Sequence, residues 1–228
     1  MADYRSDLPE RPYRIAKLPL DDRGYPVPAF VTWFDQDGEV TQPGDGKPDF
    51  RVVSLERVQR CIAGERCWIC DGVLGGFRTF VIGPMCCVNR ISSEPPSHLD
   101  CAEYAVRACP FLILPNSKSR EADLPPEATE PAGTMLRRNP GCSALWTTKR
   151  YQIETAREGG EGYLFRLAAP TSLTFWAEGR RATRAEVDAS IESGLPVLRE
   201  TCVNARELGK LTEAVTAATE LLDKQGGF

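Results

Sequence analysis

Residues 67–101 read CWICDGVLGGFRTFVIGPMCCVNRISSEPPSHLDC, and this stretch holds five of the nine cysteines and the single histidine of a 228-residue chain. Two pairs stand out in it, Cys67-x2-Cys70 at the start and His98-x2-Cys101 at the end. In the first pair, the two intervening residues allow a tight turn that directs both thiols to one side. In the second pair, residues three apart share one face of a helix. The spacing therefore predicts one four-ligand metal site.

Zinc is the metal that this donor set favours. Zn²⁺ prefers thiolate and imidazole ligands in a tetrahedron, and a site closed by four protein ligands is structural. A helix capped by Ser97 would bring its N-terminus close to Cys101, where the helix dipole stabilises a thiolate. Cys86 and Cys87 are rival ligands, and at most one of them could replace a member of the set. The cysteines interpreted as small buried hydrophobic residues are Cys61, Cys109, Cys142 and Cys202.

The order of these motifs resembles the treble-clef zinc finger, in which a zinc knuckle and a helix N-terminus hold one metal. The resemblance covers residues 67–109, where the knuckle is followed by an expected strand at 77–82, a turn at Gly83-Pro84 and a helix that Pro110 ends. It implies the same four ligands. The stretches at 67–112 and 179–200 also resemble a family of uncharacterised phage and actinobacterial proteins. This second resemblance implies a phage or prophage origin and no particular activity.

The rest of the N-terminal half predicts an extended arm followed by short elements. Residues 1–27 are rich in proline and show no sustained period. Runs rich in β-branched and aromatic residues predict strands at 29–34 (AFVTWF) and 49–54 (DFRVVS). Ser54 is a suitable N-cap for a helix that ends at Gly64.

The C-terminal half predicts a small antiparallel sheet and two helices. Three strands are expected at 144–154, 162–168 and 171–179, separated by turns that contain glycine or proline. Thr183 and Glu186 form a capping-box sequence that predicts a helix ending at Gly194. Pro196 is placed in the first turn of a second, long amphipathic helix. The fold class is therefore α+β, with a treble-clef-like N-terminal half.

An acidic, proline-rich segment at residues 115–133 separates the two halves. It has no aromatic residue to anchor it and predicts a linker, so the domain division is 1–114, 115–133 and 134–228. The chain shows neither a signal peptide nor an apolar run long enough to span a bilayer. These features predict a cytoplasmic protein without membrane contact, in which cysteines stay reduced.

Positive charge is concentrated in the C-terminal half. Residues 134–184 hold 9 basic and 4 acidic side chains, a balance of +5 in a chain of net charge −4. Arg180, Arg181 and Arg184 lie around the start of the capped helix, where backbone N–H groups and the dipole also favour an anion. These arginines predict an anion site for nucleic acid, a nucleotide or an acidic protein segment. The alternative is a solvated rim around a strand core.

The single histidine restricts the classes of enzyme. If His98 binds zinc, no histidine is left for a Cys–His pair, a Ser–His–Asp triad or a nuclease of the HNH type. The favoured function is a non-enzymatic binding or adaptor protein with structural zinc, whose partner is a protein or nucleic acid. The alternatives are a carboxylate-dependent enzyme acting on nucleic acid or nucleotides, and a nucleic-acid-binding module.

Overall fold

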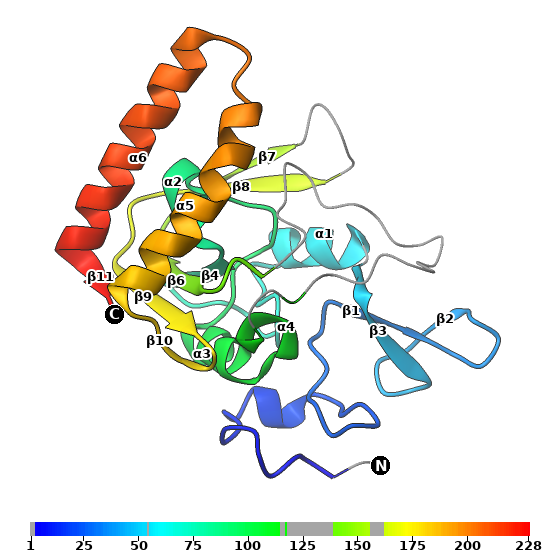
Figure 1. The fold of residues 1–228 in the computed structure, drawn as a ribbon. Helices are drawn as coiled ribbons and strands as arrows, with labels where there is room; N and C mark the ends of the chain where they lie inside the picture. The colour runs from blue at the N-terminus through cyan, green and yellow to red at the C-terminus, as the bar shows by residue number, and fades with distance from the viewer. Residues whose placement is uncertain (1–2, 54, 115–116, 118–138, 156–161) are drawn as a thin grey trace.

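The computed structural model describes residues 3–53, 55–114, 117, 139–155 and 162–228. These residues form helices and antiparallel sheets, which confirms the predicted α+β class (Figure 1). No helix in the described ranges is both long and apolar enough to cross a bilayer. The predicted linker at 115–133 lies outside the described residues apart from Ser117, so the boundary placed there stays a prediction.

A central sheet organises the molecule, with the strand order β10-β9-β6-β4 and antiparallel pairing throughout. Its strands are β4 (Arg78–Ile82), β6 (Ser143–Thr148), β9 (Ser172–Ala177) and β10 (Arg180–Arg181). A further short strand, β11 (Gly226–Gly227), pairs in parallel with β9. Because β4 pairs with β6 along its whole length, the sheet joins chain segments from both sides of residues 115–133.

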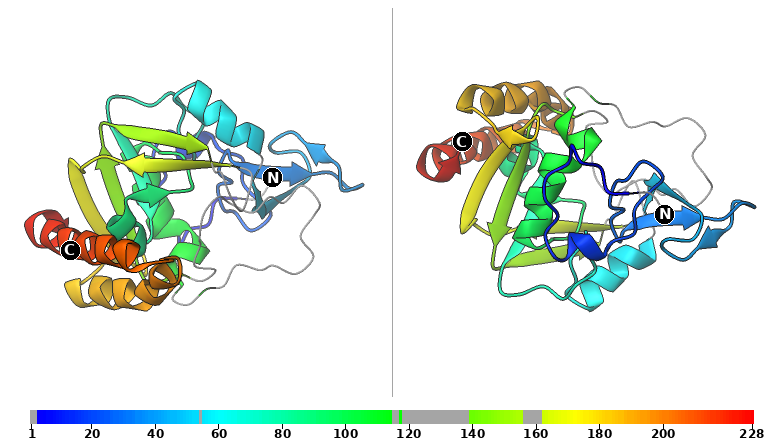
Figure 2. Two further views of the ribbon diagram at one scale, coloured as in Figure 1. Left: turned by 90° about the horizontal axis from the view of Figure 1, so that it is seen from above. Right: turned by 90° about the horizontal axis from the view of Figure 1, so that it is seen from below.

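The side chains of the central sheet alternate between two apolar faces, as successive residues of a strand do. Phe80 and Trp146 are fully buried on one face, which carries the main core. Leu145 lies on the opposite face and packs with Val106. The sheet therefore lies between two helical layers (Figure 2). Its main-core face is covered by α2 (Pro84–Asn89), α5 (Arg184–Glu200) and α6 (Ala205–Gln225), and its other face by α3 (Leu99–Ala108) and α4 (Pro110–Ile113).

The two C-terminal helices differ from the predicted pair in their boundaries. The predicted end at Gly194 is wrong, because α5 runs unbroken from Arg184 to Glu200 and includes both Gly194 and Pro196. A Cβ atom on Gly194 would lie 3.0 Å from Met85 Sδ and 3.2 Å from Met85 Cβ, so this glycine permits a close approach of α2 to α5. The chain reverses instead before Asn204, which caps α6. Figure 1 shows the resulting helical hairpin at one side of the molecule.

The helix α2 occupies a place where the sequence predicted a turn. Gly83 is its N-cap and Pro84 its first residue, a position at which the missing proline N–H costs no hydrogen bond. Arg90 ends the helix in the left-handed conformation (φ 56°). The helix is too short to show an apolar period, which is why the pattern did not reveal it.

A second sheet, with the order β5-β8-β7, closes the main core. Its strands are β5 (Ile91–Ser92), β7 (Tyr151–Thr155) and β8 (Tyr163–Leu167). The predicted single strand at 144–154 is therefore two strands, β6 and β7, which separate at Lys149-Arg150 and belong to different sheets. The predicted strands at 162–168 and 171–179 are confirmed as β8 and β9.

The N-terminal part contains a third sheet and one helix. The sheet has the order β2-β1-β3, and both predicted strands are present in it. Its strands are β1 (Val31–Phe34), β2 (Val40–Thr41) and β3 (Lys47–Val53), and α1 (Leu55–Ala63) follows. The predicted cap Ser54 lies outside the described residues. The expected extended arm instead folds back on the molecule, with a 3-10 turn at Ile15–Lys17 and a bridge between Leu20 and Pro26.

Candidate metal centre

The first pair of ligands lies in a tight turn between α1 and β4. The Cys67 N–H donates to the Gly72 carbonyl at 2.7 Å, and the Asp71 N–H donates to the Cys67 carbonyl at 2.9 Å. Asp71 takes a positive φ of 55°, which reverses the chain. The Cys70 N–H points at Cys67 Sγ, 3.5 Å away. The turn thus brings both thiols and the Cys70 backbone N–H to one side, an arrangement that can present two ligands to one metal ion.

The second pair lies at the start of α3. His98 itself is the N-cap of this helix, so the predicted cap Ser97 is wrong by one residue. Ser97 has a different role: its backbone exchanges two hydrogen bonds with Thr79 of β4, of 2.7 and 2.9 Å. This bridge fixes the strand-like approach to the helix. His98 and Cys101 then project from the first turn toward the knuckle.

The structure brings all four predicted ligands together. One ligand atom from each of Cys67, Cys70, His98 and Cys101 lies within 4.8 Å of the others. Nδ1 of His98 is 3.4 Å from Cys70 Sγ and 4.0 Å from Cys101 Sγ. A tetrahedral zinc ion with ordinary Zn–S and Zn–N bonds separates sulfur from nitrogen by about 3.6 Å. The four atoms are therefore close enough to hold a metal ion.

A backbone carbonyl determines which nitrogen of His98 faces the thiols. Nε2 lies 3.0 Å from the Val73 carbonyl oxygen. Because a carbonyl can only accept, Nε2 carries the proton and Nδ1 keeps a free lone pair in the neutral ring. Metal-bound histidines in proteins usually make this kind of outer hydrogen bond, which fixes the ring and its tautomer. The carbonyl thus prepares His98 to bind through Nδ1.

The interior side of the cluster is buried and favours a thiolate at one position. Cys67 and Cys101 are fully buried, whereas Cys70 and His98 are half-buried. Hydrogen bonds from the Cys101 and Cys70 thiols and from the Cys70 and His98 backbone N–H groups hold the pKa of Cys67 well below its usual range, against the opposing effect of burial. A group of thiols that already supports one buried thiolate suits a cation.

Gly72 allows a close approach to two of the four clustered side chains. A Cβ atom at this position would lie 3.3 Å from both Cys70 Sγ and His98 Cε1, closer than ordinary contact. By contrast, a Cβ atom on Gly75 or Gly76 would meet nothing within 4 Å. Of these three glycines, Gly72 is the one at which an added Cβ would press on Cys70 and His98. The sequence showed a glycine-rich segment but could not single out this residue.

An apolar shell that includes the N-terminal segment surrounds the buried ligands. Ile15 is fully buried and packs with Cys67, Cys101 and Tyr104. Arg14, its neighbour, forms an ion pair with Asp100 of α3 at 2.9 Å. The hydroxyl groups of Tyr4 and Tyr104 lie 3.0 Å apart. Sequence reasoning missed this role, although Ile15 was a visible apolar residue within the supposed arm.

The remaining cysteines lie elsewhere. Cys87 is buried in the main core on α2, and Cys86 is half-buried on the same helix. Cys61 and Cys142 are buried as predicted, whereas Cys109 and Cys202 are half-buried. All nine cysteines lie in the described ranges, and none is paired in a disulfide.

The predicted anion cluster is largely paired with carboxylates of the chain itself. Arg180 contacts Glu186 at 2.7 Å, and Arg184 contacts Asp188 at 2.8 Å. Arg184 also pairs with Asp223, and Arg181 stacks over the Trp176 ring at 4.7 Å. The carboxylate of Glu186 accepts the Thr183 N–H, which completes the capping box. An external anion would compete with these partners, and its binding here stays a prediction.

No known family model, curated protein or solved structure matches the chain. The resemblance to phage and actinobacterial proteins therefore gains no support from these comparisons. The fold class and the candidate site depend on the residues and geometry described above.

Proposed function

We propose that Cys67, Cys70, His98 and Cys101 bind one structural zinc ion. The observation that carries this proposal is the convergence of three thiols and a pre-oriented imidazole within 4.8 Å. Thiolate and imidazole ligands select zinc over the hard cations, which prefer oxygen. Four protein ligands leave no open coordination position, and a closed site of this type stabilises a fold.

The zinc would strengthen the contacts among three parts of the chain that meet at the cluster. The knuckle supplies two ligands and α3 supplies two, while Ile15 of the N-terminal segment packs directly on the buried thiols. Because such binding is coupled to folding, its free energy adds to the stability of all three. The arrangement of knuckle, the Thr79–Ser97 bridge and helix supports a treble-clef-like unit.

At the level of the whole protein, we infer a non-enzymatic binding or adaptor role. The single histidine of the chain faces the thiols, so the closed site occupies the residue that most acid–base and nucleophilic mechanisms need. We propose a cytoplasmic location, because thiols in that compartment stay reduced and can bind a metal.

Metal analysis of protein purified without chelator tests the site. We expect close to one zinc per chain, and a large loss of zinc together with lower solubility in His98→Ala. Cys202→Ser is the matched control, because this half-buried thiol near the α5–α6 turn lies outside the cluster, and it should keep its zinc. Absence of zinc from the parent protein, or full zinc content in His98→Ala, would refute the proposed ligand set.

A milder variant tests the geometry without removing a ligand. Gly72→Ala should weaken zinc retention against a competing chelator, because its Cβ would press on Cys70 and His98. Gly75→Ala should retain zinc like the parent, since its Cβ meets open space. Equal retention in both variants would contradict the close approach at Gly72.

A further inference from the structure

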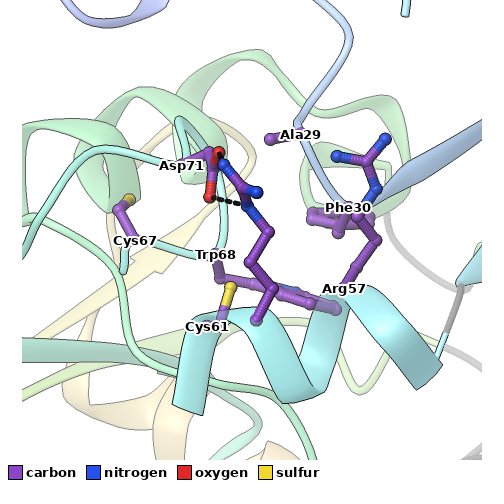
Figure 3. Close-up of a pocket in the computed structure, with 8 residues that line it drawn as sticks. Ala29, Phe30, Arg57, Cys61, Cys67, Trp68 and Asp71 are labelled. Atoms are coloured by element: carbon purple, nitrogen blue, oxygen red, sulfur yellow. Dashed lines mark hydrogen bonds and ion pairs between the residues drawn. The ribbon is translucent and has the colours of Figure 1, made fainter. Parts of the chain in front are cut away.

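The second sheet has an open edge at β7. This strand pairs with β8 on one side and with no other strand in the described ranges. It contains neither proline nor glycine, and its register with β8 is continuous from Tyr151 to Thr155. In the small hollow beside the Cys67–Cys70 turn, by comparison, Arg60 and Asp71 already bind each other at 2.8 Å (Figure 3). An open strand edge of this kind is a template for another strand.

The hydrogen bonds between β7 and β8 determine which backbone groups lie at the open edge. The Ala168 N–H donates to the Arg150 carbonyl at 3.2 Å, so these two residues form a hydrogen-bonded pair that continues the register of β7 with β8. Hydrogen-bonded and non-hydrogen-bonded pairs alternate along an antiparallel ladder. The backbone N–H and C=O groups of Tyr151, Ile153 and Thr155 therefore point away from β8, toward the open edge.

The exposure of Ile153 agrees with this placement. Ile153 is 41% exposed, whereas Phe165, its partner in register on β8, is fully buried in the main core. The two side chains lie on the same face of the sheet, because residues directly opposite each other do so. They differ in exposure because β8 has a strand on each side and β7 has a strand on one side. A strand added to the edge would remove the Ile153 side chain from water.

The charges on the other face of β7 make the strand complementary to itself. Arg150 is exposed and pairs with no carboxylate in the described part of the chain. Glu154 binds Arg166 of β8 at 2.7 Å, and a carboxylate that binds one arginine keeps further acceptor positions. When two β7 strands run antiparallel about a two-fold axis at Gln152, Arg150 of each copy lies directly opposite Glu154 of the other. Opposite charges in this position stabilise a strand pair.

We propose that two copies of the chain pair through β7, antiparallel and centred on Gln152. The same register places Tyr151 of each copy beside Ile153 of the other, an aromatic and β-branched pair that favours strand association. Because both residues have outward backbone groups, they also exchange main-chain hydrogen bonds across the axis. The two sheets become one, with the order β5-β8-β7-β7-β8-β5. A small edge-to-edge interface of this kind gives a weak dimer.

Sedimentation velocity of the zinc-loaded full chain tests the proposal, at chain concentrations up to about 1 mM, where a dimer with a Kd of about 1 mM or tighter is populated. We expect a concentration-dependent shift from monomer to dimer. Arg150→Glu should weaken dimerisation at least about tenfold, because both symmetric contacts change from attraction to repulsion. Glu154→Arg should weaken it for the converse reason. Arg206→Glu on exposed α6 makes the same change in net charge as Arg150→Glu and should dimerise like the parent.

An equimolar mixture of Arg150→Glu and Glu154→Arg tests the register itself. The mixed pair brings opposite charges face to face again, so it should dimerise about as tightly as the parent. The proposal is overturned if the parent stays monomeric, if Arg150→Glu dimerises like the parent, if Arg206→Glu weakens the dimer equally, or if the mixture does not recover.

Zinc content and the melting temperature are measured for each protein. Both should match the parent in Arg150→Glu, because this exposed side chain lies outside the metal cluster. A monomeric parent that retains zinc would overturn the dimer and leave the zinc proposal intact, so the two failures are distinguishable.

Discussion

Replacing Ile15 by alanine tests how firmly the N-terminal segment is attached. Ile15 is fully buried among Cys67, Cys101 and Tyr104, so the three carbons lost in Ile15→Ala come from the interior. At about 0.8 kcal/mol for each buried carbon, the transfer free energy alone is about 2.4 kcal/mol. The cavity left behind raises the expected loss of unfolding free energy to about 3 kcal/mol.

Urea unfolding in zinc-containing buffer measures this loss. With an m-value of about 2 kcal/mol per M, the midpoint should fall by about 1.5 M. Zinc should also pass faster to a chelator, because Ile15 covers the buried thiols. Leu208→Ala is the control, since its side chain on α6 is 45% exposed and should change stability by less than about 0.5 kcal/mol. An equally small loss of unfolding free energy in Ile15→Ala would refute the packing of this segment and favour the extended arm that the sequence predicted.

Three further predictions concern other parts of the fold. Gly194→Ala should lower the unfolding free energy by about 1 kcal/mol, because its Cβ would crowd Met85. Gly209→Ala should raise the unfolding free energy by a similar amount through helix propensity, since its Cβ would meet nothing within 4 Å. Urea unfolding of both variants checks that the two changes have opposite signs. Hydrogen bonds from the Arg180 side chain and the Thr183 backbone N–H lower the pKa of Glu186 to about 2. The ionised Glu186 therefore stabilises the fold fully at a pH above the ordinary pKa of 4.5, and this stabilisation is lost as the pH falls toward 2. The stability difference between parent and Glu186→Gln should therefore shrink between pH 6 and pH 3, and a constant difference would contradict the capping geometry. Limited proteolysis should cut first within residues 115–133, and the two fragments should co-elute in gel filtration because β4 pairs with β6. First cuts elsewhere would contradict the predicted linker, and separate elution of the fragments would contradict the strand pairing.

The clustering of Cys67, Cys70, His98 and Cys101 could be predicted because it is encoded locally. Two residues between Cys67 and Cys70, and two between His98 and Cys101, are enough to place each pair on one side of a turn or a helix. The group that orients the His98 ring is the backbone carbonyl of Val73. This contact could not be predicted, because a backbone carbonyl has no side-chain signature and reaches His98 only once the Cys67–Cys70 turn has folded.

The errors arose where distant contacts override local preference. Gly194 and Pro196 are typical of a helix boundary, yet α5 continues because Gly194 packs against Met85 of α2. Ile15 lacked any periodic neighbours, and its burial depends on α3, more than 80 residues further along the chain. Lys149-Arg150 lies between two strands, not within one, because β6 and β7 belong to different sheets. Tertiary packing of this kind leaves little trace in a window of ten residues.

The pairing of β4 with β6 has a consequence for the nascent protein. During synthesis from the N-terminus, the four candidate ligands, Cys67, Cys70, His98 and Cys101, are all translated before residue 143, the first residue of β6. At about 5–20 residues per second, this order gives a window of several seconds in which metal capture can precede completion of the sheet. Throughout that window β4 is an unpaired strand with Phe80 uncovered. Early zinc loading would anchor β4 through the Thr79–Ser97 bridge and thus limit its chance to pair with a neighbouring chain.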